Sequence, residues 1–274
     1  FLLGERMIPL RHAAAAAITL ARLQMFGRMR RWITLGVFAL PVMMALITRY
    51  FSPDLESARM AAYVAASAGL FATVIVPFMG VFWGSAVFSD EVEGKTLVFL
   101  WTRPAGRVPV LLIKWLVVAA TLALLIAPSL GLIFIILFYD NGFGRIVSEG
   151  AMPLHDYAAL ALGVLAYCAL GLFLSTLLKR PLAAGVTYVL IWDNAMHFIP
   201  GYLKLFSIRH YVAVLSSRPA EGAPKGWLEF LAKSDTTEMQ AITTLLVLTL
   251  ALAAAAAVVL TLREYRTDDP ARTQ

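Results

Sequence analysis

Long apolar runs, separated by short polar segments, dominate the hydrophobic pattern of this chain. The runs are apolar on all sides and lack the alternating polarity that a transmembrane strand would show. Most are close to the roughly 20 residues that an α-helix needs to cross the hydrocarbon core of a bilayer. The pattern predicts an all-α polytopic membrane protein with six transmembrane helices. These lie near residues 32–48, 60–88, 115–138, 157–178, 181–202 and 239–262.

The fifth of these segments differs from the others because polar residues interrupt it. It is apolar as far as Trp192, and Asp193 and His197 then precede its end. Two interpretations stay open. Asp193, His197 and Tyr188 line a path for substrate or protons, because ionisable groups inside a membrane are costly and commonly functional. Alternatively, the span simply ends there, and its two ionisable groups contact lipid headgroups or the outer loop.

Composition supports a membrane location. Hydrophobic residues make up 60% of the chain and charged residues only 15%, whereas soluble domains carry about 25% charged residues. The single cysteine, Cys168, lies in an apolar run, so the chain cannot form an internal disulfide. The net charge of +6 could suggest a nucleic-acid partner, but the positions of the basic residues give it another explanation.

Lysine and arginine are concentrated before the first span, between spans 2 and 3, between spans 4 and 5, and after span 6. Positive charge marks the cytoplasmic side of a membrane protein. We therefore expect a multi-pass protein of the cytoplasmic membrane with both termini in the cytoplasm. No role in binding nucleic acid is needed to explain the charge.

The remaining segments complete a single transmembrane domain over residues 1–274. Residues 9–31 mix alanine and arginine with apolar residues, which predicts an interfacial helix at the cytoplasmic surface; a soluble lead-in is the alternative. Residues 203–238 form a long outer loop with two apolar clusters. These clusters predict short helices that rest on the outer membrane face or dip into it.

The cytoplasmic loop at residues 89–107 carries the most informative pattern. Asp90, Glu91 and Glu93 follow directly after Phe88, on the side where positive charge is expected. Ser89 could cap a short helix, whose positive N-terminal end would suit these acids. We interpret the segment as a docking element for a cytoplasmic partner. A solvated, capped helix start is the simpler alternative.

This loop resembles the signature of the ABC-2 family of transporter permeases, and the topology matches the family plan. In that signature an acidic stretch leads to Gly-Thr and Leu, and then to Pro and Arg before span 3. Lys95 separates Gly94 from Thr96, where the common form has them adjacent. The matching residues are Asp90, Glu91, Glu93, Gly94, Thr96, Leu97, Arg103, Pro104 and Arg107, with Lys114 at the entrance of span 3.

The resemblance implies a transmembrane permease subunit of an ATP-binding cassette transporter in the inner membrane of a prokaryote. By analogy with the family, the direction of transport would be export. Residues 89–107 would be the coupling helix that inserts into a separate ATPase subunit, which binds the ATP and Mg. A second permease subunit, identical or related, would complete a dimer. The outer loop at 203–238 would fold as short re-entrant helices before the last span.

The chain contains none of the motifs of an ATPase, a zinc protease or a serine hydrolase. Gly94-Lys95-Thr96 resembles the end of a phosphate-binding loop, but Ser89 stands where its first glycine is required. We therefore expect no catalytic residues, metal or cofactor in this chain. Two alternatives stay open: an intramembrane enzyme that uses Asp193 and His197, and a non-transporting membrane scaffold.

Gly80 and Gly84 form a small-xxx-small motif in span 2. Such a motif permits close approach of two helices in a membrane. We expect a helix-packing contact here, either with span 5 or with another subunit.

Overall fold

The part of the chain that the structure describes is helical. The structure is a computed structural model that describes residues 28–51, 56–93, 107–139, 150–193, 207–216 and 237–262, with the single positions 19, 195 and 205. No strand occurs in these ranges, so the all-α prediction is confirmed for them. The elements are α2 (Arg28–Phe51), α3 (Glu56–Val64), the π-helix η1 (Ala65–Ile75), α4 (Val76–Glu93), α6 (Arg107–Phe138), α8 (Ala151–Leu177), α9 (Pro181–Thr187), the π-helix η3 (Tyr188–Asp193), α11 (Ile208–Ser216) and α13 (Glu238–Leu262).

Five stretches of described helix are long and apolar enough to cross a membrane. They are Trp32–Phe51, Ala58–Val92, Val108–Phe138, Ala151–Leu177 and Glu238–Leu262. Each contains or overlaps one of the predicted spans. The remaining predicted span, 181–202, contains a shorter apolar helix, Pro181–Asp193, and most of the rest of it lies outside the described residues. By helix length alone, the described residues therefore give five candidate spans rather than six.

Several helices extend beyond the apolar runs that predicted them. The second span is one continuous helical stretch through α3, η1 and α4, and it ends only at Glu93. The third begins at Arg107, within the predicted loop. Glutamate, lysine and arginine end an apolar run without ending a helix, because they are good helix formers. The expectation that Ser89 caps a new helix is therefore wrong: Ser89 lies inside α4, and its Oγ donates to the carbonyl of Ser85 at 2.9 Å.

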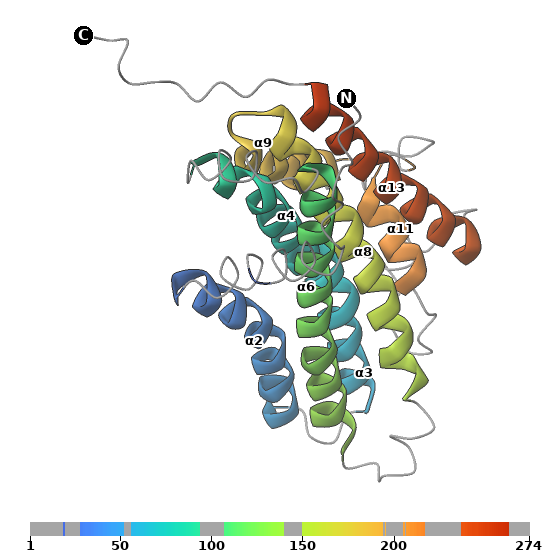
Figure 1. Cartoon of the computed structure of the whole chain (residues 1–274). Helices are drawn as coiled ribbons and strands as arrows, with labels where there is room; N and C mark the ends of the chain where they lie inside the picture. The colour runs from blue at the N-terminus through green and yellow to red at the C-terminus, as the bar shows by residue number, and fades with distance from the viewer. Residues whose placement is uncertain are drawn as a thin grey trace, which may run out of the picture.

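Helix α8 is the centre of the bundle. It packs against α4, α6, α11 and α13, and its buried side chains include Leu160, Val164, Tyr167 and Leu172. Helix α2 packs mainly on α6 and lies at the side of the bundle (Figure 1). Most of its apolar surface is exposed, as expected for a helix that faces lipid.

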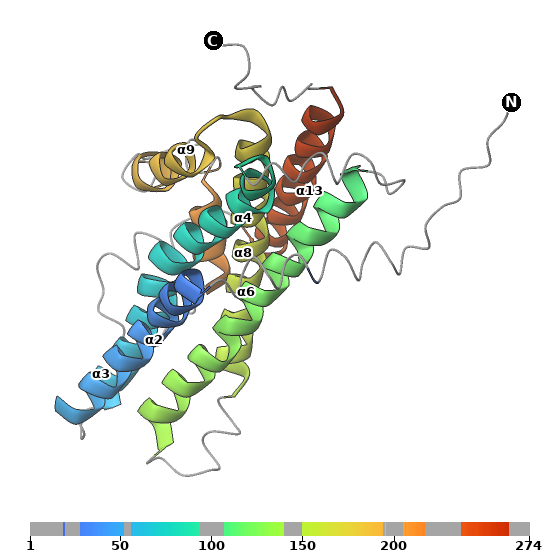
Figure 2. The same cartoon turned by 60° about the vertical axis from the view of Figure 1, so that its left-hand side comes forward.

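Four helix ends lie together at one end of the bundle. The C-terminal ends of α4, α8 and α13 and the N-terminal end of α6 are at the top in both views (Figure 1, Figure 2). The opposite end holds the start of α3, the end of α6 and the start of α8. Helices α8 and α13 run in the same direction, and both end at this end of the bundle (Figure 1).

Two expected segments fall largely outside the described residues. Of the interfacial helix at 9–31, the structure describes only position 19 and the first residues of α2. Of the outer loop at 203–238, it describes mainly α11. That helix packs against α8, α13 and η1, so this part of the loop lies within the bundle rather than on its surface.

Candidate functional site

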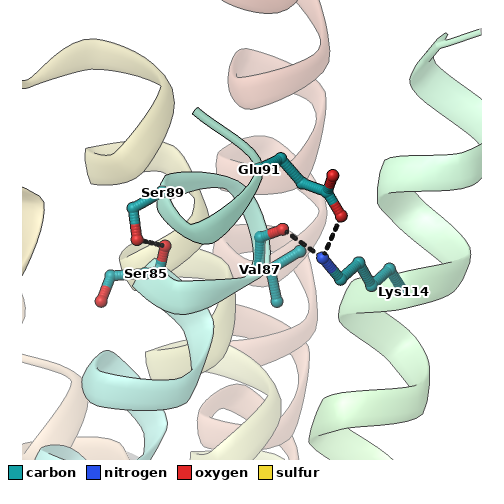
Figure 3. A network of polar contacts seen from close by, with 5 residues as sticks. All are labelled: Ser85, Val87, Ser89, Glu91 and Lys114. Carbon is teal, nitrogen blue, oxygen red and sulfur yellow. Dashed lines mark hydrogen bonds and ion pairs between the residues drawn. The ribbon is translucent and has the colours of Figure 1, made fainter. Parts of the chain in front are cut away.

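A buried ion pair joins α4 and α6 at the end of the bundle where the predicted docking loop begins. Lys114 Nζ lies 2.7 Å from Glu91 Oε1 and also donates to the carbonyl of Val87 at 2.9 Å (Figure 3). The Lys114 side chain is only 4% exposed. Each of the two buried charges therefore compensates the other, since breaking a buried ion pair strongly destabilises a protein.

The position of this pair follows from helix electrostatics. Glu91 lies in the last turn of α4, where carbonyl groups give the helix a negative end and a carboxylate is unfavourable. The positive charge of Lys114 compensates both the Glu91 carboxylate and the negative helix end, because its ammonium group contacts Glu91 and a backbone carbonyl near the end of α4. Figure 3 shows the two side chains reaching toward each other, with Ser89 on another side of α4. The pair thus fixes the end of α4 to α6.

The predicted docking residues are only partly within the described chain. Asp90 is half-buried near the end of α4, Glu93 is the last residue of that helix, and Arg107 is the first residue of α6. The structure brings these two helix ends to the same end of the bundle (Figure 2). The predicted docking residues that lie outside the described residues are Gly94, Thr96, Leu97, Arg103 and Pro104.

A second polar junction surrounds Asp193, which is 2% exposed. Tyr167 of α8 donates its hydroxyl to Asp193 Oδ2 at 2.6 Å, and Ser207 donates to Oδ1 at 2.8 Å. Tyr188 is a further hydrogen-bond neighbour, and the charge of Arg209 acts on the same carboxylate. The junction therefore joins α8, η3 and the start of α11.

This placement changes the interpretation of the fifth predicted span. Asp193 ends η3 and contacts Ser207 of the predicted outer loop, as the second interpretation allows, while Tyr167 of α8 donates to its other oxygen. Tyr188 and Asp193 are brought together, as a shared path would require, whereas His197 lies outside the described residues. A hydroxyl group of the protein donates to each carboxylate oxygen, so the arrangement ties α8, η3 and the residue before α11 together.

The glycine motif of span 2 packs against α8. A Cβ atom on Gly80 would lie 2.6 Å from Cβ of Tyr167, and one on Gly84 would overlap the backbone of Cys168. Gly171 makes the same kind of close contact from α8, since a Cβ atom on it would lie 2.7 Å from the backbone nitrogen of Ser85 and the backbone oxygen of Val81. The close contact that the motif predicts is thus present, and its partner is α8, which corresponds to the fourth predicted span.

Among the described residues, no group of three or more histidine, cysteine, aspartate or glutamate side chains could hold a metal ion. The only cysteine, Cys168, is buried in α8. The buried carboxylates Glu91, Asp156 and Asp193 instead join one helix to another.

Comparison with known protein families agrees with this arrangement. The family model described as ABC-2 family transporter protein matches residues 16–269, which is most of the chain. The chain belongs to the ABC-2 transporter family. No curated protein sequence matches it closely enough to count as a relative.

Membership in this family makes the chain a membrane permease of an ABC transporter, a transport subunit rather than an enzyme. The apolar helices agree with a multi-pass membrane protein. The family model covers both the predicted docking loop and the Asp193 junction, so both belong to the permease domain itself.

Two parts of the permease were not predicted from the sequence. The sequence predicts Lys114 at the entrance of span 3 but does not reveal that it lies two turns inside α6 and pairs with Glu91. The sequence did contain a signal for this pair: a lone lysine in an apolar helix, with several acids at the end of the preceding span. Ser207 and Arg209 were not linked to Asp193, because their distance from it along the chain hides their proximity in space.

Proposed function

We propose that this permease couples ATP hydrolysis by a separate ATPase subunit to movement of a substrate across the membrane, in the direction of export. The ATPase would bind the ATP and Mg and would dock at residues 89–107. A second permease subunit, identical or related, would complete the transporter. The chain would lie in the inner membrane of a prokaryote with both termini in the cytoplasm.

One observation carries this proposal: the Glu91–Lys114 pair that fixes the end of α4 to the first turns of α6. A docking loop can transmit force only if its two ends are held firmly by the helices it is meant to move. The buried pair provides such an attachment, at 2.7 Å and largely shielded from solvent. A movement of the loop caused by the ATPase would therefore displace α4 and α6 together. The two helices would move as rigid elements that shift between two packings.

The course of the chain supports six crossings. Helices α8 and α13 run in the same direction (Figure 1), and the segment between them begins with the helix Pro181–Asp193. At 1.5 Å per residue this helix reaches about 20 Å, short of the roughly 30 Å hydrocarbon core. We propose that the chain beyond Asp193 completes the fifth crossing, and that α11 is a re-entrant helix of the outer loop.

Charge reversal of the loop acids tests the proposal. Glu91 is unsuitable, because changing it would also break its pair with Lys114. We expect Asp90→Lys combined with Glu93→Lys to lower co-purification of the ATPase by roughly an order of magnitude, since like charges across an interface cost several kcal/mol. The ATPase is identified by its Walker motif in mass spectrometry of the purified complex.

The control is Glu238→Lys, which makes one acid-to-lysine reversal of the same kind at the exposed start of α13. It should leave both the amount of permease in the membrane and its association with the ATPase unchanged. If the Asp90→Lys, Glu93→Lys variant inserts normally and retains its ATPase as fully as the Glu238→Lys variant does, docking at this loop is refuted.

A further inference from the structure

Helix α11 carries an arginine at the depth of the membrane interior. A Cβ atom on Gly163 of α8 would lie 2.9 Å from Val212 Cγ2, so the two helices touch at Gly163. At 1.5 Å per residue, Gly163 is about 18 Å from the start of α8 and about 21 Å from its end. Because α8 is a candidate membrane span, this contact lies near the middle of the hydrocarbon core. Arg209 is in the same short helix, one turn before Val212.

An arginine at this depth needs a counter-charge, because ionisable groups inside a membrane are costly and pair with one another or face a polar space. Asp193 meets part of this need: it is 2% exposed, and the charge of Arg209 acts on its carboxylate. The same carboxylate accepts from Tyr167 at 2.6 Å and from Ser207 at 2.8 Å. Asp193 therefore anchors the arginine to the interior of the bundle.

The backbone that carries Arg209 is fixed by polar contacts on two sides. The hydroxyl of Tyr188 in η3 is hydrogen-bonded to the backbone of Ile208. The side chain of Tyr211 is hydrogen-bonded to that of Thr244 in α13. Helix α11 also packs against both α8 and α13 (Figure 1). A residue held in this way needs little further ordering when a ligand binds, which favours affinity.

The two faces of α11 differ in exposure and in chemistry. The buried face consists of Ile208, Tyr211, Val212 and Leu215. Arg209 and His210 are only half-buried, so their side chains reach the edge of the packed interior. A guanidinium group offers five N–H donors in a planar fork that matches phosphate and carboxylate groups, and an imidazole can add one more donor. This edge of α11 therefore has the chemistry of an anion site.

Apolar surface adjoins the same junction. Leu190, Ile191 and Trp192 immediately precede Asp193 in η3, and each of the three is at least 40% exposed. A ligand that reaches Arg209 within the membrane has to carry apolar groups beside its anionic group, because its surroundings are hydrocarbon and burying polar surface there is costly. The combination fits an amphiphile with an anionic headgroup.

We propose that Arg209 and His210 form a binding site for the anionic headgroup, a phosphate or a carboxylate, of an amphiphile that enters from the membrane. Arg209 binds the anionic oxygens through its planar fork, and His210 donates from the next position. Asp193 is a positioning residue, which holds Arg209 at the edge of the bundle. That this amphiphile is the transported substrate rests on the proposed function. The site itself belongs to this chain alone and can be tested without the ATPase.

Photolabelling in the membrane tests the site. Two probes carry the same photoreactive acyl chains: a phosphatidate, which has a phosphate headgroup, and a diacylglycerol, which has none. The full chain in membranes, without the ATPase, is irradiated with each probe, and labelled peptides are identified by mass spectrometry. We expect the phosphatidate to label the peptide that contains α11 roughly tenfold more than the diacylglycerol does. This factor corresponds to one hydrogen bond between charged groups.

The test variant combines Arg209→Gln with Asp193→Asn, because removing both charges avoids a buried charge without its partner. We expect it to lower phosphatidate labelling of α11 to the level of the diacylglycerol. Arg209→Lys keeps the charge beside Asp193 but lacks the planar fork, and it should cause a smaller loss. The matched control is Arg49→Gln, which removes another half-buried arginine, at the end of α2, whose Nη1 donates to the Ile136 carbonyl at 2.6 Å. This control should leave labelling of α11 unchanged.

Three results would overturn the site. They are equal labelling of α11 by the two probes, labelling of the double variant as strong as that of Arg49→Gln, and no labelling of α11 by either probe. The last would be expected if a second permease subunit covered this face of α11. None of these results bears on docking of the ATPase, which the loop charge reversal tests separately.

Competition with inorganic phosphate identifies the source of the anion. If an excess of inorganic phosphate suppresses labelling of α11 by the phosphatidate, a free phosphate group can fill the site. If it does not, the anionic group has to be attached to apolar chains. Either result supports an anion site at Arg209, and the second supports an amphiphile as its ligand.

Discussion

Three carboxylates are buried among the described residues, and each accepts a hydrogen bond from another helix. Glu91 of α4 pairs with Lys114 of α6. On α8, Asp156 accepts from Tyr63 of α3, and Asp193 of η3 accepts from Tyr167 of α8 and from Ser207. In a bundle where apolar packing alone gives little orientation, such pairs fix which helices are neighbours and at what height.

The Glu91–Lys114 pair gives the clearest prediction at this scale. Removing Lys114 takes away the opposite charge that compensates the burial of Glu91, so we expect Lys114→Met to lower the free energy of unfolding by about 3–5 kcal/mol. Adding Glu91→Met should recover much of that loss, because replacing both charges by apolar groups avoids the unpaired charge. The measurement is the midpoint of thermal unfolding in detergent for both single variants and the double variant. Additive losses would contradict the pairing.

At the scale of elements, the contact of α4 with α8 depends on glycines rather than on large side chains. Gly80, Gly84 and Gly171 let the two backbones approach so closely that a Cβ atom on any of them would overlap its neighbour. Small residues at such crossings replace hydrophobic burial as the source of helix association in lipid. This contact holds the helix that carries Glu91 against the centre of the bundle.

Gly171→Val tests the close contact, because its added side chain meets the Ser85 nitrogen and the Val81 oxygen, which cannot move out of the way. We expect the free energy of unfolding to fall by about 1–3 kcal/mol, the usual cost of overpacking a core. The control is Gly131→Ala in α6, where an added Cβ meets nothing within 4 Å and the gain in helix propensity is about 1 kcal/mol. Equal thermal midpoints for the two variants would contradict the account.

The sequence was sufficient for the helical class and for five spans, because an apolar run longer than a bilayer crossing has few other solutions. It was insufficient for helix ends, since Ser89 to Glu93 look like the start of a new segment but continue α4. The partners within the candidate sites could not be read either. Gly84 signals a close contact without naming α8, and Asp193 signals a need for donors without naming Ser207.

At the scale of the whole molecule, the arrangement separates two working regions. The ends of α4, α6, α8 and α13 meet at one end of the bundle (Figure 2), where Glu91 and Lys114 tie two of them together. The Asp193 junction and α11 lie further along α8, around Tyr167 and Gly163. Helix α8 contacts both α4 and α11, so the two regions share one central helix.

The account rests on the end of α4 facing the cytoplasm and meeting an ATPase there. The direct test is labelling of Glu93→Cys by a membrane-impermeant maleimide, in intact cells and in inside-out vesicles, with and without the ATPase bound. We predict reaction only from the cytoplasmic face, and a slower reaction when the ATPase is present. Reaction from the outside, or a cytoplasmic rate that the ATPase leaves unchanged, would contradict the account.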